Sequence, residues 1–249
     1  MRLTVIGCAG TFPGPDSACS SYLLEHDGFR LLIDAGNGST GTLQRVTGLL
    51  GVDAVVISHL HGDHYLDLVT YTYARRYHPT GRPACLPVHG PSDIREHVAS
   101  AFGRPVDELL AEVYDFKPIP GPGEFEIGPF SFRVDRVNHP VETYAMRISD
   151  GAHTMAYSAD TGNSDKLVEL ARGVDLFLCE ASYLEGDHNP PDVHLTGKQA
   201  GEHAARAEVD RLLLTHLVPW GDRHRTLTEA KEAFDGNVDV ASSLATYDI

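Results

Sequence analysis

The sequence predicts an α/β fold, and three observations support this prediction. Short apolar runs rich in β-branched residues, such as 54–57, recur along the chain at strand length. Segments of helical length with apolar residues near one face, such as 65–77, lie between several of these runs. With 249 residues, 42% of them hydrophobic and 22% charged, the chain can bury a sizeable core. No linker-like or low-complexity stretch interrupts it, so we expect one domain over residues 1–249.

The N-terminal half is expected to open with strands and to continue with alternating strands and helices. Residues 2–7 form the first expected strand, and a loop rich in glycine and proline follows it. The pair Asp27-Gly28 is a strong turn signal and predicts a hairpin between the next two strands. These strands are expected at 20–25 and 29–33, followed by a strand at 54–57, a short strand and turn at 86–91, and helices at 42–49, 65–77 and 93–102.

The C-terminal half is expected to contribute the second sheet. Gly-Pro turns separate its first strands, and Asp150-Gly151 predicts another hairpin. The expected strands are 114–119, 123–127, 130–137, 143–148, 153–157, 174–179, 211–215 and 238–241, and the expected helices are 164–171, 196–207 and 228–234.

The densest chemical signal lies at residues 59–64, directly after an expected buried strand. His59 and His61 are two positions apart, so their side chains point the same way on an extended backbone. Asp63 and His64 lie on the turn that follows and could face a second metal ion. Imidazole and carboxylate groups suit a divalent metal such as zinc. The alternative, polar residues on a solvated loop, is disfavoured because three histidines in six positions are too dense.

Four later titratable residues also follow expected strands: His139, Asp160, Glu180 and His216. One alone would be weak evidence, because a lone histidine is usually structural. Together with residues 59–64 they form one set at strand ends. Two zinc ions that share a carboxylate and a water need about seven protein ligands. The chain offers that many in His59, His61, Asp63, His64, His139, Asp160 and His216.

Three further polar residues receive other roles. Asp34 ends the strand expected at 29–33, where a carboxylate can orient a metal-bound histidine through a hydrogen bond. The alternative for Asp34 is a simple turn or cap residue. His89 and His97 do not belong to a comparable cluster of possible metal ligands in the sequence, so we expect them to be structural.

The same residues make the chain resemble the metallo-β-lactamase superfamily. The resemblance rests on the His-X-His-X-Asp-His run, the later histidine, Ser-Ala-Asp-Thr-Gly at 158–162 and Thr-His-Leu at 215–217, and it spans essentially the whole chain. Cys-Glu-Ala-Ser at 179–182 followed by His-Leu-Thr at 194–196 makes it most similar to the ribonuclease Z-like phosphodiesterase branch. The resemblance implies an αββα sandwich, with two mixed sheets flanked by helices and the site at the edge of the sheets.

The resemblance also implies how the ligands divide. One zinc would take His59, His61 and His139, the other would take Asp63, His64 and His216, and Asp160 would bridge them. Three differences from other branches of the superfamily narrow the possible activities of this chain. His61 stands where the redox di-iron branch usually has glutamate, and Asp160 stands where penicillin-degrading enzymes often use cysteine. His139 and Asp160 are only 21 positions apart, which leaves no room for the long arm of tRNA-processing ribonuclease Z.

The net charge and composition of the chain restrict the substrates and partners that we expect it to bind. The formal net charge is −15, with 20 Lys and Arg against 35 Asp and Glu, so an extended contact with long nucleic acid is unlikely to form. A small anionic substrate remains compatible, because a two-metal site is itself strongly positive. No apolar stretch approaches the ~20 residues of a membrane span. The N-terminus lacks the apolar core of a signal peptide, and the four cysteines are scattered, so we expect a cytoplasmic protein. A homodimer is expected because dimers are common in this branch.

These observations predict a metal-dependent phosphodiesterase with two Zn²⁺ ions, Mn²⁺ being an alternative. The substrate would be a small phosphodiester, such as a 3′,5′-cyclic nucleotide, attacked by a metal-bridging hydroxide. Asp63 would act as ligand and proton acceptor, and His194 would protonate the departing oxygen. By similarity to ribonuclease Z, Glu180 would orient His194, whose alternative role is that of a helix-start residue. The alternatives are an RNA nuclease like ribonuclease Z, a thioester or lactone hydrolase, and a metal-binding regulatory module without catalysis.

Overall fold

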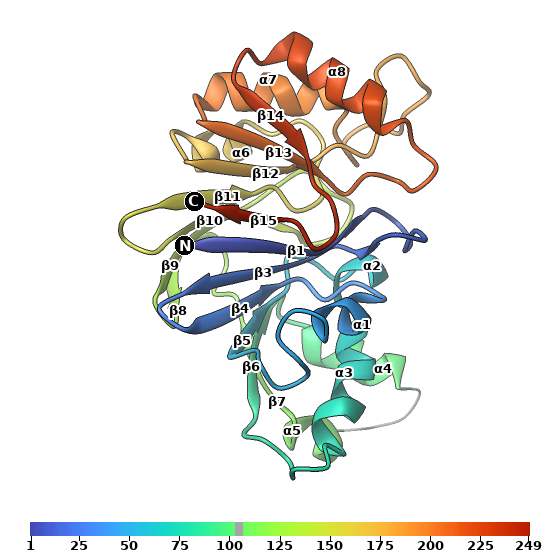
Figure 1. The fold of residues 1–249 in the computed structure, drawn as a ribbon, viewed down its shortest axis with the longest axis vertical. Coiled ribbons are helices and arrows are strands. Elements are labelled where there is room, and N and C mark those ends of the chain that lie inside the picture. Colours follow the sequence, from blue (N-terminus) through green and yellow to red (C-terminus); the bar gives the residue numbers. More distant parts are fainter. Residues whose placement is uncertain (103–106) are drawn as a thin grey trace.

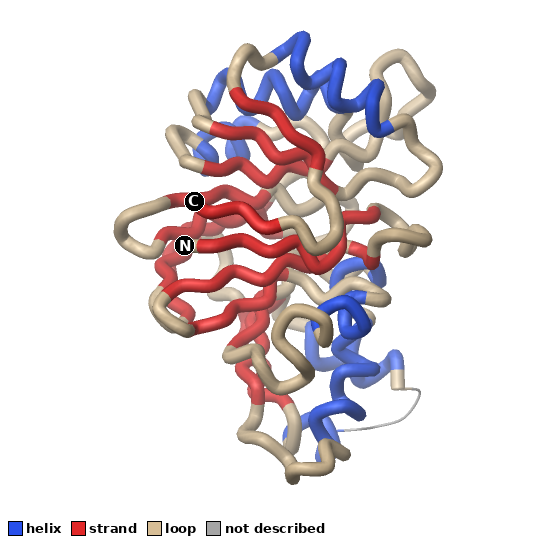
Figure 2. Tube along the Cα trace, viewed as in Figure 1, coloured by secondary structure: helices blue, strands red, loops and turns tan. Residues whose placement is uncertain are grey.

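Two mixed β-sheets pack face to face, and helices cover their outer faces (Figures 1 and 2). This computed structural model describes residues 1–102 and 107–249. The arrangement is the αββα sandwich that the sequence and its resemblance predicted. In the described part of the chain, no helix is long and apolar enough to cross a membrane.

The first sheet comes mainly from the N-terminal half. Its strand order is β15-β1-β3-β4-β5-β6-β7, with β2 beside β1, so the last strand of the chain pairs antiparallel with the first. These strands are β1 (Arg2–Ala9), β2 (Ala18–Cys19), β3 (Ser21–His26), β4 (Phe29–Ile33), β5 (Ala54–Val56), β6 (Leu86–Gly90), β7 (Tyr114–Pro118) and β15 (Thr246–Asp248).

The second sheet comes from the C-terminal half and runs β14-β13-β12-β11-β10-β9-β8. Strands β11 to β14 are parallel neighbours, whereas β8 to β11 pair antiparallel. Its strands are β8 (Gly123–Ile127), β9 (Phe130–Arg136), β10 (Tyr144–Ser149), β11 (Thr154–Tyr157), β12 (Leu176–Glu180), β13 (Arg211–Thr215) and β14 (Asn237–Val240).

The helices segregate by sheet. Helices α6, α7 and α8 cover the second sheet, and the earlier helices lie against the first (Figure 1). Their bounds are α1 (Ser39–Leu43), α2 (Gly62–Tyr65), α3 (Asp67–Arg76), α4 (Ile94–Ala101), α5 (Asp107–Ala111), α6 (Asp165–Ala171), α7 (Gly197–Ala207) and α8 (Arg223–Ala233).

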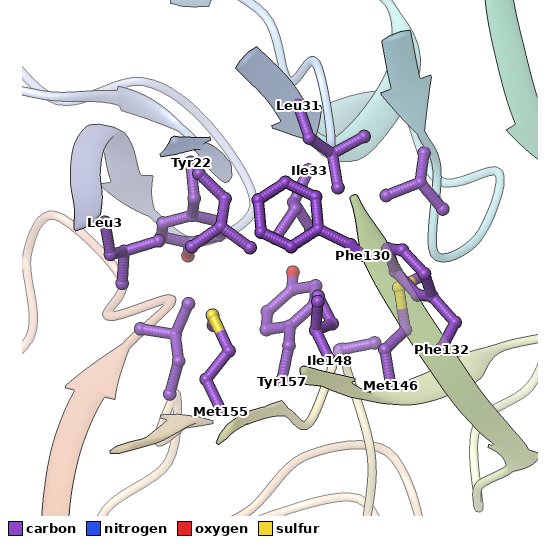
Figure 3. Packing of buried hydrophobic residues seen from close by; sticks show 14 of the residues in the cluster. Leu3, Tyr22, Leu31, Ile33, Phe130, Phe132, Met146, Ile148, Met155 and Tyr157 are labelled. Carbon is purple, nitrogen blue, oxygen red and sulfur yellow. The ribbon is translucent and has the colours of Figure 1, made fainter. Parts of the chain in front are cut away.

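The largest core cluster lies between the two sheets. Figure 3 shows Leu3, Tyr22 and Ile33 of the first sheet facing Met155 and Tyr157 of the second. Strand β9 alternates buried and exposed residues, because one of its faces looks outward. Every residue of β12 is buried, because this strand has the other sheet on one face and helices on the other.

Several expected boundaries were wrong. The helix expected at 42–49 is the short α1, and turns occupy the residues that follow it. The helix expected at 65–77 is divided into α2 and α3. Helix α8 begins five residues before the expected 228, because the carboxylate of Asp222 accepts the N–H groups of His224 and Arg225 and so caps the first turn. Strand β15 was not expected at all, and it is stabilised by its pairing with β1.

Candidate metal centre

The strands that precede the expected ligands end at one edge of the sandwich. Strands β4 and β5 are parallel neighbours, as are β11, β12 and β13, so the carboxyl ends within each set lie at the same edge. His59 and His61 follow β5, Asp160 follows β11, and His216 follows β13. Helix α2, which carries the rest of the opening motif, lies at the edge where the loops after β1 and β13 also meet (Figure 1).

A first group of possible metal ligands consists of His59, His61, His139 and Asp160. One donor atom from each lies within 4.8 Å of the others. Nε2 of His139 is 3.0 Å from Nδ1 of His61, and Nε2 of His59 is 3.5 Å from Oδ2 of Asp160. This group could hold one metal ion.

A second group consists of Asp63, His64, Asp160 and His216, again with donor atoms within 4.8 Å of one another. Nε2 of His216 lies 3.1 Å from Oδ2 of Asp63 and 3.4 Å from Oδ2 of Asp160. Nε2 of His64 lies 3.3 Å from Nε2 of His216 and 3.2 Å from Oδ1 of Asp160. Asp160 belongs to both groups, so its carboxylate lies between two possible ion positions.

The chemistry of these donors fits a divalent cation. Two of their buried atoms, Nε2 of His59 and Oδ1 of Asp160, make no hydrogen bond of acceptable geometry despite these close approaches, although buried polar atoms normally make one. Nitrogen and oxygen donor atoms therefore converge in a largely buried space, which is costly unless a cation or a proton lies between them. Imidazole and carboxylate are also the ligands that zinc prefers among oxygen and nitrogen donors.

Hydrogen bonds from neighbouring residues orient the rings of His64 and His59, and for His59 the partner is the Ser58 hydroxyl, 3.1 Å from Nδ1. The fully buried carboxylate of Asp34 lies 2.8 Å from Nδ1 of His64, the contact that the sequence suggested. Ser58 donates to Asp34 through its backbone N–H and its hydroxyl, and the hydroxyl of Tyr157 donates to the same carboxylate. Such contacts fix the ring and leave Nε2 directed at the group.

Two more histidine rings are oriented in the same way. Nδ1 of His139 lies 2.9 Å from the carbonyl oxygen of Val193, and Nδ1 of His216 lies 2.8 Å from the hydroxyl of Ser182. His89 and His97 lie outside both groups of possible ligands.

The surroundings keep most of these donors in the protonation state that binds a metal. Burial lowers the pKa of His59 to about 4 and that of His139 to about 3. Burial alone would raise the pKa of Asp160, but the facing imidazoles hold it well below its ordinary value. His64 is the exception: burial alone would lower its pKa, but the carboxylates of Asp160 and Asp34 together raise it well above its ordinary value. A metal ion must therefore displace a proton from His64.

His194 and Glu180 lie beside the two groups, and with His216 they form a third set of donor atoms within 4.8 Å of one another. Nδ1 of His194 lies 2.8 Å from Oε1 of the fully buried Glu180, which also accepts the backbone N–H groups of Thr161, Ser182 and Leu195. Burial alone would lower the pKa of His194, but the Glu180 carboxylate raises it to about 9. The His194 ring therefore carries a proton that it can donate at neutral pH.

Comparison with known families agrees with this geometry. A family model described as the beta-lactamase superfamily domain matches residues 29–217. The chain belongs to the β-lactamase superfamily. The matched range includes every residue of the two possible ligand groups as well as Glu180 and His194.

Superfamily relatives match along the whole chain. The uncharacterized protein ML1173 of Mycobacterium leprae is 42% identical, over 100% of this chain and 89% of that protein. The probable metallo-hydrolase YhfI of Bacillus subtilis is 32% identical, over 98% of each chain. A ribonuclease Z of Mycobacterium bovis is 27% identical, over 100% of this chain and 98% of that protein.

Solved structures of the superfamily show the same fold. The crystal structure of YhfI from Bacillus subtilis superposes with a TM-score of 0.89 at 30% identity, covering 99% of this chain and 98% of that one. The short form of human tRNase Z gives a TM-score of 0.80 at 19% identity, covering 100% and 99% of the two chains. At that identity the likeness concerns the fold alone.

Several supporting residues of this superfamily site were not singled out from the sequence. The hydroxyl of Ser182 donates to the carbonyl oxygen of His216 as well as contacting its ring. The backbone N–H of Thr11 donates to Oδ2 of Asp63 at 2.7 Å. A Cβ on Gly10 would lie 2.5 Å from the carbonyl oxygen of His216, so only glycine fits there. The sequence signal for these positions was their presence in the glycine- and proline-rich loop after the first strand and in Cys-Glu-Ala-Ser at 179–182.

Proposed function

We propose that this metallo-hydrolase of the β-lactamase superfamily cleaves a small phosphodiester, such as a 3′,5′-cyclic nucleotide, with two Zn²⁺ or Mn²⁺ ions. The observation that carries the proposal is the position of Asp160, which belongs to both ligand groups and has a buried oxygen without a hydrogen-bond partner. Two adjoining groups that share a carboxylate are what a two-metal phosphodiesterase requires.

In this proposal each group holds one ion. His59, His61 and His139 would bind the first ion, Asp63, His64 and His216 would bind the second, and Asp160 would bridge them. Two divalent ions bound there would supply positive charge for the phosphoryl oxygens and lower the pKa of a water molecule to near neutrality.

Residues of the chain would accept the proton of the attacking water and donate a proton to the leaving oxygen. Asp63 would accept a proton from the attacking water, and its side chain is the most exposed of the second group, at 11% against 2% or less for the others. Burial alone would raise the pKa of the Asp63 carboxyl, but the imidazoles of His216 and His64 hold it well below its ordinary value. Thr11 holds the Asp63 carboxylate in place through its backbone N–H. His194 would give its proton to the departing sugar oxygen, and Glu180 would orient His194 and keep it protonated.

Two features support a small substrate. The net charge of −15 disfavours a long contact with phosphates. Strands β10 and β11 form a hairpin that occupies most of the interval between His139 and Asp160, where tRNA-processing relatives are expected to carry an arm. The likeness to the ribonuclease Z of Mycobacterium bovis nevertheless makes RNA cleavage the second candidate.

We propose further that residues 1–249 act as one domain, as a homodimer, in the cytoplasm. The free state of Cys8, Cys19, Cys85 and Cys179 supports a reducing compartment. Light scattering on the purified protein tests the dimer: a mass near 27.1 kDa at all concentrations would contradict it.

The test of the reaction is a substrate panel on zinc-loaded and manganese-loaded protein. It contains 3′,5′-cyclic AMP, bis(p-nitrophenyl) phosphate, a tRNA precursor, a lactone and a glutathione thioester. We expect turnover of the two small phosphodiesters, reduced at least about 100-fold by Asp63→Ala and unchanged by His97→Ala, which alters an exposed histidine outside both groups. Preferred cleavage of the tRNA precursor would establish the second candidate. Turnover of the lactone or thioester alone would refute both.

A further inference from the structure

Two aromatic rings, the half-buried Phe12 and the exposed Trp220, pack together on the loops after β1 and β13. The ring centroids are 4.5 Å apart and the planes are inclined by 35°. Trp220 is 79% exposed, the largest exposure among the big apolar side chains in the described part of the chain. Tryptophan is usually well buried, so such a ring at the surface is a candidate contact site.

Both rings lie within a few residues of the proposed site along the chain. Phe12 directly follows Thr11, whose N–H donates to Oδ2 of Asp63. Trp220 lies four residues after His216, in the loop between β13 and α8. That loop and the loop after β1 lie side by side at the edge that carries α2 (Figure 1). The loops that carry the aromatic pair therefore border the proposed active site.

The two loops are held together rather than free. Gly10 donates its N–H to the carbonyl oxygen of Leu217 at 3.1 Å, and Leu217 donates to the carbonyl oxygen of Cys8 at 3.2 Å. Gly221 donates to Val218 at 2.7 Å, which closes a turn around Trp220. An aromatic surface held in this way loses little conformational entropy when a ligand packs on it.

We propose that Phe12 and Trp220 form a stacking surface for the nucleobase of a nucleotide whose phosphate is bound at the metal centre. This inference rests on the proposed function and specifies its substrate class. Bases stack on aromatic side chains whatever their identity, because every base has a π-face. The chain is acidic, with a net charge of −15, so it offers few cations to bind a nucleotide. Uncharged rings would contact the base, and the metal centre would bind the anionic phosphate.

The protein carries its own probe, because Trp220 is its single tryptophan. Zinc-loaded protein is titrated with 5′-AMP and with ribose 5-phosphate, which has no base, while tryptophan emission is recorded and binding is measured independently by calorimetry. We expect saturable quenching by 5′-AMP with the midpoint found by calorimetry. Ribose 5-phosphate should bind roughly 5- to 150-fold more weakly and leave the emission unchanged.

Variants separate stacking from other roles. Trp220→Ala should weaken 5′-AMP binding to the level of ribose 5-phosphate without lowering the Tm, because the ring is exposed, and Trp220→Phe should restore most of the affinity. Tyr77→Ala is the matched control. Tyr77 is also exposed, at 67%, but it follows α3, about 15 Å along the helix from the end next to α2.

Three results would overturn the stacking surface. The first is 5′-AMP binding that leaves the emission unchanged, and the second is equal affinity of wild type and Trp220→Ala. The third combines two observations: tryptophan emission that changes with protein concentration in the absence of ligand, and a dimer that dissociates in the Trp220→Ala variant. Together they would show that the rings contact a second copy of this chain. The proposed reaction is judged separately: quenching by 5′-AMP without turnover of any phosphodiester would remove the function and keep the base site.

Discussion

Replacing Gly36 by alanine tests how closely the loop after β4 must pack against the turn that carries Asp63. A Cβ on Gly36 would overlap the carbonyl oxygen of Asp63. It would also lie 2.9 Å from the carbonyl carbon of Asp63 and 2.7 Å from Cβ of Cys19, whereas ordinary contacts begin at 3.4 Å. The Asp63 backbone must therefore move by roughly 1 Å, because neither close neighbour is the end of a flexible side chain.

A shift of that size should affect the reaction more than the fold. We expect Gly36→Ala to lower kcat/KM on bis(p-nitrophenyl) phosphate about 100-fold, because a misplacement of about 1 Å at a catalytic group has that effect. We expect the free energy of unfolding to fall by only about 1–3 kcal/mol, which is usual for one extra methyl group in a packed site. One of the two metal ions should bind more weakly, because Asp63 belongs to the second ligand group.

Gly41→Ala is the matched control for this substitution. Gly41 lies in α1, and a Cβ there would meet nothing within 4 Å. Alanine at this position should keep full activity and stabilise the helix by up to about 1 kcal/mol. The two variants are compared by metal content, kcat/KM and denaturant unfolding. A Gly36→Ala protein with two metal ions per chain and wild-type kcat/KM would refute the steric reasoning.

Four further predictions test other parts of the molecule. Asp34→Asn removes the anionic partner of His64, so metal affinity in equilibrium dialysis should fall about 10- to 100-fold, and an unchanged affinity would argue against this role. His194→Ala should slow cleavage of 3′,5′-cyclic AMP about 100-fold and that of bis(p-nitrophenyl) phosphate much less, because nitrophenolate leaves without a proton; equal losses would exclude a proton donor. Phe130→Ala should lower the free energy of unfolding by about 3–5 kcal/mol in a urea titration, since the ring is fully buried between the sheets. Removing metal with a chelator should lower the Tm, because the ligand groups exist only in the folded chain; an identical Tm would mean that no metal is held there.

Elements with a local sequence pattern could be predicted, whereas elements stabilised by tertiary pairing or by capping could not. Strands such as β5 and β12 were expected close to their observed bounds, because apolar runs of β-branched and large residues carry their own signal. Strand β15 was missed, because its polar residues 246–248 show no strand pattern and only pairing with β1 stabilises it. The start of α8 was expected five residues too late, because the capping side chain of Asp222, which fixes this start, was not recognised.

The sequence by itself determined the kind of chemistry available: histidines and carboxylates placed directly after buried strands, spaced so that several could share one metal centre. Only the tertiary structure decided which of them meet. Asp160 lies between two ligand groups because β11 and β5 end at the same edge of different sheets, and Ser182 reaches His216 because β12 and β13 are parallel neighbours. Phe12 meets Trp220 only because the loops after β1 and β13 pack together. Contacts between residues so far apart leave no local periodicity in the sequence, and they form only when the strands pair and the two sheets pack together.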